Sequence, residues 1–158
     1  MPSPHELADQ YLAGAAQLRA AIAGMTREQL TARPVAGKWS TLEVVCHLSD
    51  FDPILADRMK RVIALHSEVP LLMGADENLF VTELRYAERD AGEELAVIDA
   101  TRKQMARIIR GLKPEQLQLT GNHNKRGFQT LEKVIGMAIN HIPHHVAFIA
   151  EKRKALGA

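Results

Sequence analysis

Apolar residues recur at helical spacing in four long segments of the chain, about residues 4–23, 41–66, 91–112 and 130–154. In each segment they stand three and four positions apart, which places them along one face of a helix. We find no convincing strand pattern and no internal repeat. The pattern therefore predicts an all-α fold, a four-helix bundle in a single domain that spans residues 1–158.

Helix-start signals support these boundaries. Ser3 and Ser40 are each followed three residues later by a glutamate, the pattern of a capping box, and Asp90 precedes the third segment in the same way. Prolines interrupt two apolar stripes, Pro53 in the second helix and Pro143 in the fourth. Because each stripe continues in phase beyond its proline, we expect bent helices that do not break.

Two connections are long for a simple up-and-down bundle. Residues 67–90 carry scattered apolar side chains, and we expect a lid-like connection with a short helix around residues 78–87. Residues 113–129 form a second irregular stretch. At least one of these connections is expected to cross the end of the bundle or to cover a site.

Composition narrows the class of partner. The 20 basic and 19 acidic residues leave a net charge of +1, so no charge excess favours a nucleic-acid partner. Only 4% of residues are aromatic, which argues against a stacking platform for single strands. From the sequence pattern we expect neither a signal peptide nor a membrane span. The single Cys46 is expected to be a buried core thiol, and its lack of an internal disulfide partner favours the cytoplasm.

Three histidines, His141, His144 and His145, fall within five residues of the last helix. At about 100° per residue, His145 lies roughly 50° from the centre of the apolar stripe and His141 roughly 80–90° from it. His144 lies roughly 150° away and should face solvent. His141 and His145 therefore border the core four residues apart, a spacing at which two imidazoles can reach one metal ion.

Such a pair is equally consistent with two packed, hydrogen-bonded side chains. His47, at the edge of the stripe of the second helix, is by itself more typical of a packing histidine. Only if His47 faces the pair across the bundle does it supply a third nitrogen. Pro143, between the two candidates, either simply curves the helix or sets the angle between them.

Several short motifs together resemble the DinB-like (YfiT-like) superfamily of metal-binding proteins. They are Gly37-Lys38-Trp39-Ser40, the helix from Leu42 to Leu48 that contains His47, the turn Asn124–Gly127 followed by Thr130-Leu131, and the His-x-x-x-His pair at 141 and 145. The resemblance covers nearly the whole chain. It implies up-down-down-up connectivity with a long crossover, a metal site of His47, His141 and His145, and a homodimer. The implied ion is zinc or nickel, with water at its remaining positions.

Relatives in that superfamily include transferases and isomerases that use a low-molecular-weight thiol (bacillithiol, mycothiol or glutathione) and metal-dependent hydrolases. Some isomerase relatives have glutamate where this chain has His141, which disfavours that branch. Three neutral imidazoles with an open position are typical of a catalytic metal, which lowers the pKa of a bound water or thiol. We expect a metal-dependent thiol transferase or hydrolase acting on a small molecule. The alternative is a non-catalytic metal-binding bundle with a role in stress response or interaction.

Three further polar side chains are candidates for the surroundings of this site. Asp50, one turn beyond His47, is either a hydrogen-bond partner of a ligand imidazole or a solvated surface aspartate. His123 and Asn124 either line the mouth of a pocket or belong to an ordinary turn. The enzyme hypothesis predicts a pocket beside the three histidines, lined partly by residues 67–90. Converging histidines without such a cavity would favour the non-catalytic bundle.

Overall fold

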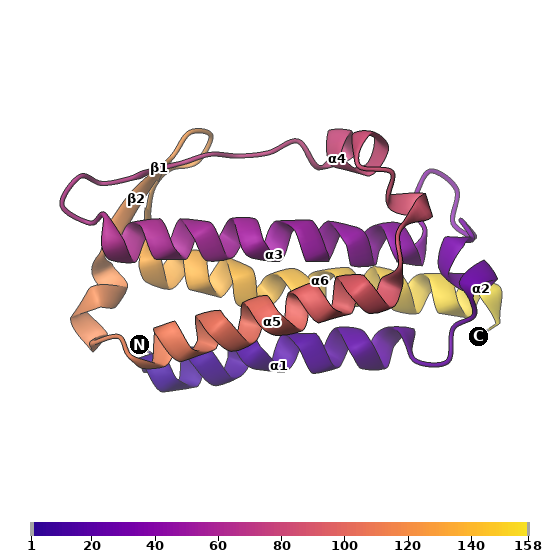
Figure 1. Cartoon of the computed structure of the whole chain (residues 1–158), viewed down its shortest axis with the longest axis horizontal. Helices are drawn as coiled ribbons and strands as arrows, with labels where there is room; N and C mark the ends of the chain where they lie inside the picture. Colours follow the sequence, from indigo (N-terminus) through magenta and orange to yellow (C-terminus); the bar gives the residue numbers. More distant parts are fainter. Residues whose placement is uncertain (1, 158) are drawn as a thin grey trace.

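The computed structural model describes residues 2–157. Four long helices lie side by side: α1 (Pro4–Ile22), α3 (Thr41–Ala64), α5 (Ala91–Arg110) and α6 (Leu131–Leu156). Helices α1 and α6 run in one direction and α3 and α5 in the other, so the connectivity is up-down-down-up (Figure 1). Helices α1 and α3 each pack against both α5 and α6. The all-α four-helix bundle expected from the sequence is confirmed.

Capping explains where the helices begin. The side chains of Ser3 and Ser40 accept hydrogen bonds from the backbone N–H groups of Glu6 and Glu43, and each glutamate carboxylate accepts a hydrogen bond from the backbone N–H of its capping serine. A third capping box opens the single turn of α2 (Arg27–Thr31). Helices α3 and α6 continue without a break through Pro53 and Pro143, as expected.

The connection between α3 and α5 runs back along the length of the bundle (Figure 1). It contains β1 (Leu71–Leu72), α4 (Glu77–Glu83) and the 3-10 turn η1 (Tyr86–Glu88). Between α5 and α6 lie the 3-10 turn η2 (Pro114–Gln118) and a hairpin of β2 (Thr120–His123) and β3 (Gly127–Thr130). The expectation of a chain without strands is therefore wrong for these two stretches.

The three strands form one small sheet in the order β1-β2-β3. Strand β1 pairs with β2 in parallel, with Leu72 opposite His123, and β2 pairs with β3 antiparallel. Gly121 lets Leu72 and Val62 approach closely, since a Cβ at this position would lie 2.9 Å from a side-chain carbon of each. The sheet fixes the crossover to the hairpin at one end of the bundle.

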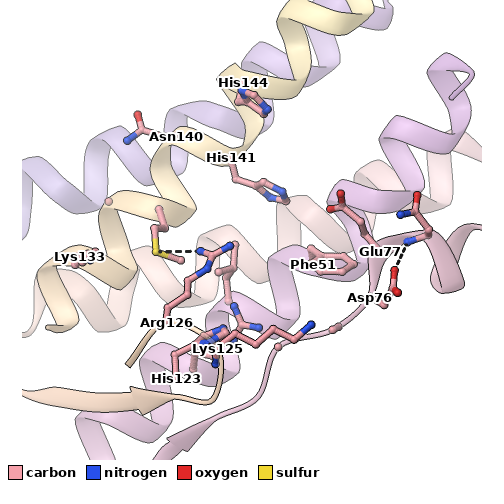
Figure 2. Close-up of a pocket in the computed structure, with 17 residues that line it drawn as sticks. Phe51, Asp76, Glu77, His123, Lys125, Arg126, Lys133, Asn140, His141 and His144 are labelled. Atoms are coloured by element: carbon pink, nitrogen blue, oxygen red, sulfur yellow. Dashed lines mark hydrogen bonds between the residues drawn. The ribbon is translucent and has the colours of Figure 1, made fainter. Parts of the chain in front are cut away.

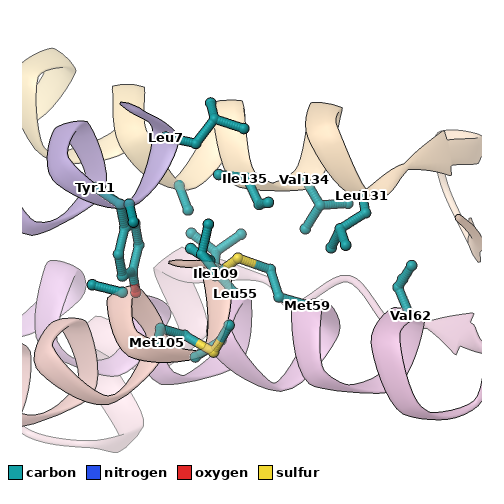
Figure 3. Close-up of a cluster of buried hydrophobic side chains, with 14 of the residues drawn as sticks. Leu7, Tyr11, Leu55, Met59, Val62, Met105, Ile109, Leu131, Val134 and Ile135 are labelled. Atoms are coloured by element: carbon teal, nitrogen blue, oxygen red, sulfur yellow. The ribbon is translucent and has the colours of Figure 1, made fainter. Parts of the chain in front are cut away.

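The core consists of two clusters of buried aliphatic side chains. The cluster nearer the sheet joins all four long helices through residues that include Tyr11, Leu55, Met105 and Ile135 (Figure 3). None of the described helices is both long enough and apolar enough to cross a membrane.

A buried ion pair connects the four helices through polar contacts. The guanidinium of Arg102 on α5 donates to both carboxylate oxygens of Asp52 on α3, at 2.7 and 3.1 Å. It also donates to the backbone carbonyls of Tyr11 on α1 and Ala138 on α6. Gly14 leaves room for this side chain, because a Cβ there would collide with Arg102. Each of the three guanidinium nitrogens of Arg102 therefore has an acceptor within the core.

Candidate metal centre

The three histidines singled out in the sequence converge across the bundle. His47 projects from α3, and His141 and His145 project from α6. One ring nitrogen of each lies within 4.8 Å of the others, and the Nε2 atoms of His47 and His141 are 3.0 Å apart. His47 is fully buried, whereas His141 and His145 are partly exposed. His47 therefore faces the His141–His145 pair across the bundle, which is the arrangement it needs to supply a third nitrogen.

Aromatic packing holds the His47 ring. The ring centroid of Trp39, which precedes the cap of α3, lies 5.3 Å from that of His47, and the Phe51 centroid lies 4.5 Å away on the next turn of α3. Phe80 of the crossover in turn packs on Phe51, at 5.2 Å. The sequence motif around Trp39 therefore supplies one wall of the site.

Burial keeps all three imidazoles neutral. Desolvation, with the charge of His145 as a smaller cause, lowers the pKa of His47 to about 3. Desolvation lowers the pKa of His141 to about 3, and that of His145 to about 4, with neighbouring histidines adding to each shift. A neutral imidazole offers a lone pair to a metal ion, so the group is in its binding form at neutral pH.

The residues fit a divalent ion on two further grounds. Zinc binds histidine nitrogens at about 2.0–2.1 Å, which places tetrahedral ligands roughly 3.3 Å apart, close to the observed 3.0 Å between His47 and His141. The Nδ1 atoms of all three histidines are buried and have no hydrogen-bond partner among the described residues, so no neighbouring group fixes which ring nitrogen carries the proton. Each imidazole is therefore free to present the nitrogen that faces the other two, and neutral nitrogen ligands suit zinc or nickel.

Asp50 does not serve this site. Its carboxylate accepts two hydrogen bonds from Arg89, at 2.9 and 3.1 Å, and Arg89 also pairs with Glu94. The Asp50 side chain is 19% exposed. The two roles considered for it, a partner of a ligand imidazole and a solvated surface group, are both wrong, because an arginine 39 residues away reaches it from the end of the crossover.

Glu77 is a site residue that the sequence analysis missed. Its Oε2 lies 3.9 Å from Nε2 of His47. Glu77 is the first residue of α4, which Asp76 caps by accepting from the backbone N–H of Asn78. The sequence did contain a signal for a helix start here, because acidic residues such as Asp76 and Glu77 are typical of the first turn of a helix. The expected start at residue 78 placed Glu77 outside the helix.

A cavity of about 1020 Å³ reaches the candidate centre at His141, which is the one of the three histidines that lines it. Helix α3 contributes side chains that include Phe51, the crossover supplies residues 74–78, and the β2–β3 turn and α6 supply the remaining walls (Figure 2). The lid-like connection therefore does line a pocket beside the histidines. The enzyme hypothesis predicted such a pocket, and converging histidines without one would have favoured the non-catalytic bundle.

The other candidate side chains also have defined places. His123 is buried at the end of β2 and lines the cavity, and Asn124 accepts a hydrogen bond from the backbone N–H of Gly74 at 2.9 Å. His144 is exposed, as its helix phase predicts, and lines the rim. Cys46 is fully buried, its Sγ lies 3.6 Å from the Tyr86 carbonyl oxygen, and it is not among the residues that line the cavity.

Comparison with known proteins adds a family and a fold. The profile of the DinB superfamily matches residues 10–149. "Putative metal-dependent hydrolase OB0782" of Oceanobacillus iheyensis is 29% identical over 139 residues, covering 87% of this chain and 79% of the relative. "Putative metal-dependent hydrolase YfiT" of Bacillus subtilis is 28% identical over 144 residues, covering 90% and 79%.

The solved structure of Bacillus subtilis YfiT has a similar fold. It superposes with a TM-score of 0.89 at 24% identity, over 98% of this chain and 87% of that one. It is described as "a probable metal-dependent hydrolase with an unusual four-helix bundle topology". The two proteins therefore share the same bundle fold although their sequence identity is low.

Proposed function

Because the chain belongs to the DinB superfamily, we propose that it is a divalent-metal-dependent enzyme that hydrolyses a small molecule. The observation that carries this proposal is the convergence of His47, His141 and His145 beside a cavity of about 1020 Å³. Known small-molecule pockets measure roughly 300–1,000 Å³, so the cavity is large enough for a substrate. The names of the relatives, metal-dependent hydrolases, agree with this reaction class.

His47, His141 and His145 would hold the ion, zinc or nickel, through one nitrogen each. A divalent ion in a three-histidine site supplies Lewis acidity and lowers the pKa of a coordinated water to about 7. The packing of Trp39 and Phe51 on His47 orients that ring without a hydrogen bond to its Nδ1. The protein therefore contributes a rigid set of nitrogen ligands that needs no protonation change at neutral pH.

Glu77 is suited to move the proton in hydrolysis. Its Oε2 faces Nε2 of His47 from the opposite wall at 3.9 Å, and the side chain is 53% exposed, so solvent reaches it. In the proposed reaction Oε2 accepts the proton of the attacking water and returns it to the leaving group. Proton transfer of this kind contributes about 10²–10⁴-fold to a rate.

Transfer of a low-molecular-weight thiol is the second candidate reaction. The cavity volume supports it, since about 1020 Å³ lies at the upper end for one ligand and leaves room for a second reactant. The same centre would lower the pKa of a bound thiol. A homodimer and a cytoplasmic location also remain expectations for this protein.

The test is a hydrolysis screen of p-nitrophenyl esters and amide analogues, with parallel reactions that add a thiol. We expect turnover that requires zinc or nickel, that falls by about 10²-fold or more in Glu77→Gln, and that leaves the metal content of this variant unchanged. The exposed His66 provides a matched control, and His66→Ala should keep full activity. Equal turnover with and without metal would overturn the proposal.

A further inference from the structure

One wall of the cavity carries four basic side chains, those of Arg58, Lys125, Arg126 and Lys133. None of the four lies within 4.0 Å of a carboxylate of residues 2–157, whereas eight arginine–carboxylate ion pairs form elsewhere in this part of the chain. In Figure 2 Lys133 and Arg126 lie on one side of His141, and the acidic Asp76 and Glu77 lie on the other. The cavity is therefore divided into a basic side and an acidic side.

Arg58 is the most informative of the four. Only 8% of its surface is exposed, and its guanidinium donates to the carbonyl of Met73, but its Nε is buried with no partner among the described residues. The other deeply buried arginine, Arg102, is paired through two bonds with Asp52. A buried guanidinium N–H without an acceptor is costly. Arg58 therefore brings a positive charge to the cavity that, unlike the charge of Arg102, no carboxylate of residues 2–157 pairs with.

The basic side chains also act on one another. Burial lowers the pKa of Arg58, and the charge of Arg126 lowers it further. At the buried His123, desolvation and then the charges of Arg58, Arg126 and Lys125 lower the pKa. Positive charges thus converge on one part of the cavity, and the largely buried Arg58 attracts an anion more strongly there than an exposed charge would.

The fold holds this wall in place. Lys125 and Arg126 occupy the β2–β3 turn, which Gly127 allows by adopting a φ of +68°. The turn is fastened to the crossover by the Gly74–Asn124 hydrogen bond. Lys133, in the first turns of α6, is two helical turns from His141. The basic side chains and the histidines are therefore carried by connected elements.

We infer that the basic wall binds an anionic group, a carboxylate or a phosphate, of the small molecule that enters this cavity. Arg58 and Arg126 supply planar guanidinium groups suited to paired oxygens, and Lys133 supplies a further positive charge. Asp76 and Glu77 repel the anion, so the rest of the molecule extends toward His141. That orientation rests on the function proposed above, whereas binding of the anion itself does not.

The test measures binding of inorganic phosphate and of succinate to metal-free protein by NMR titration of backbone amides. The variant Arg126→Gln/Lys133→Gln removes two exposed charges of the wall, and Arg107→Gln/Lys154→Gln removes the same two charge types from exposed positions outside the cavity. We expect wild type and the second variant to bind equally, and the first to bind at least about tenfold more weakly. The probe that binds more tightly identifies the class of anion.

Three results would overturn the inference: no binding of either probe by wild type, equal binding by all three proteins, or equal weakening in both variants. Because the titration uses metal-free protein, it is separable from the proposed reaction. His145→Ala should keep anion binding while it loses metal-dependent turnover. Anion binding without any turnover would contradict the proposed function and leave the basic wall as the site of the anion.

Discussion

Nε2 of His47 and Nε2 of His141 lie 3.0 Å apart, although 94 positions separate the two residues in the chain. The contact forms because α3 and α6 pack side by side with these residues on facing sides. Trp39 and Phe51 cover the His47 ring, so both imidazoles are desolvated and neutral. Two neutral imidazoles in contact, with His145 beside them, constitute the centre on which the proposed chemistry depends.

Replacing Asp52 by asparagine should destabilise the fold strongly. The change leaves the buried Arg102 without its counter-charge, and loss of one partner from a buried pair costs about 3–5 kcal/mol. Urea unfolding measures this loss. The exposed Asp57, paired with Arg61, is the control, and Asp57→Asn should cost less than about 1 kcal/mol. Similar small losses in both variants would contradict the role given to the buried pair.

Glu43 should make stability depend on pH. Burial alone would raise the pKa of its carboxyl, but hydrogen bonds from Arg33 and from the Ser40 backbone outweigh burial and lower it. A carboxyl with a lowered folded pKa stabilises the protein above its unfolded pKa, about 4.3, and this stability is lost as the pH falls through the folded pKa. Wild type should therefore exceed Glu43→Gln by roughly 1–2 kcal/mol at pH 7.

The pH dependence of that difference is the decisive part. Urea unfolding of both proteins at pH 7 and at successive values below pH 4.5 should show the gap closing as Glu43 takes up a proton. A gap that stays constant over this range would show that the carboxylate charge does not contribute, and that only the geometry of the cap matters.

Cys46 should be inert in the folded protein. Burial, followed by the charge of Glu94, raises the pKa of its thiol to about 12, so almost no thiolate exists at pH 8. A colorimetric thiol reagent should label native protein slowly and label protein in denaturant at once. Rapid, complete labelling of the native protein would contradict a buried thiol, and would reopen a role for it in chemistry.

The helices could be predicted from the sequence because their signals are local. Capping boxes and apolar stripes located the ends of all four long helices within two residues of the observed positions. The resemblance carried by Trp39, His47 and the His141–His145 pair predicted the DinB superfamily, and this is confirmed. Helix phase also placed His144 on the outside correctly.

The parts that failed depend on partners distant in the chain. Strand β1 has only two residues and pairs with β2 some fifty positions away, so no alternation marks it. Asp50 was misjudged because Arg89 reaches it only through the path of the crossover. Glu77 and Arg58 gain their significance from the cavity that the crossover encloses, which no periodic pattern encodes.

Metal analysis of purified protein is the most direct test of the centre. Wild type, His145→Ala and a control variant at an exposed histidine, His5→Ala, are purified and incubated with zinc or nickel in parallel. Wild type and His5→Ala should each carry about one divalent ion per chain. Loss of the third nitrogen should reduce the content of His145→Ala well below that value. Equal metal content in all three proteins would contradict a site made by His47, His141 and His145.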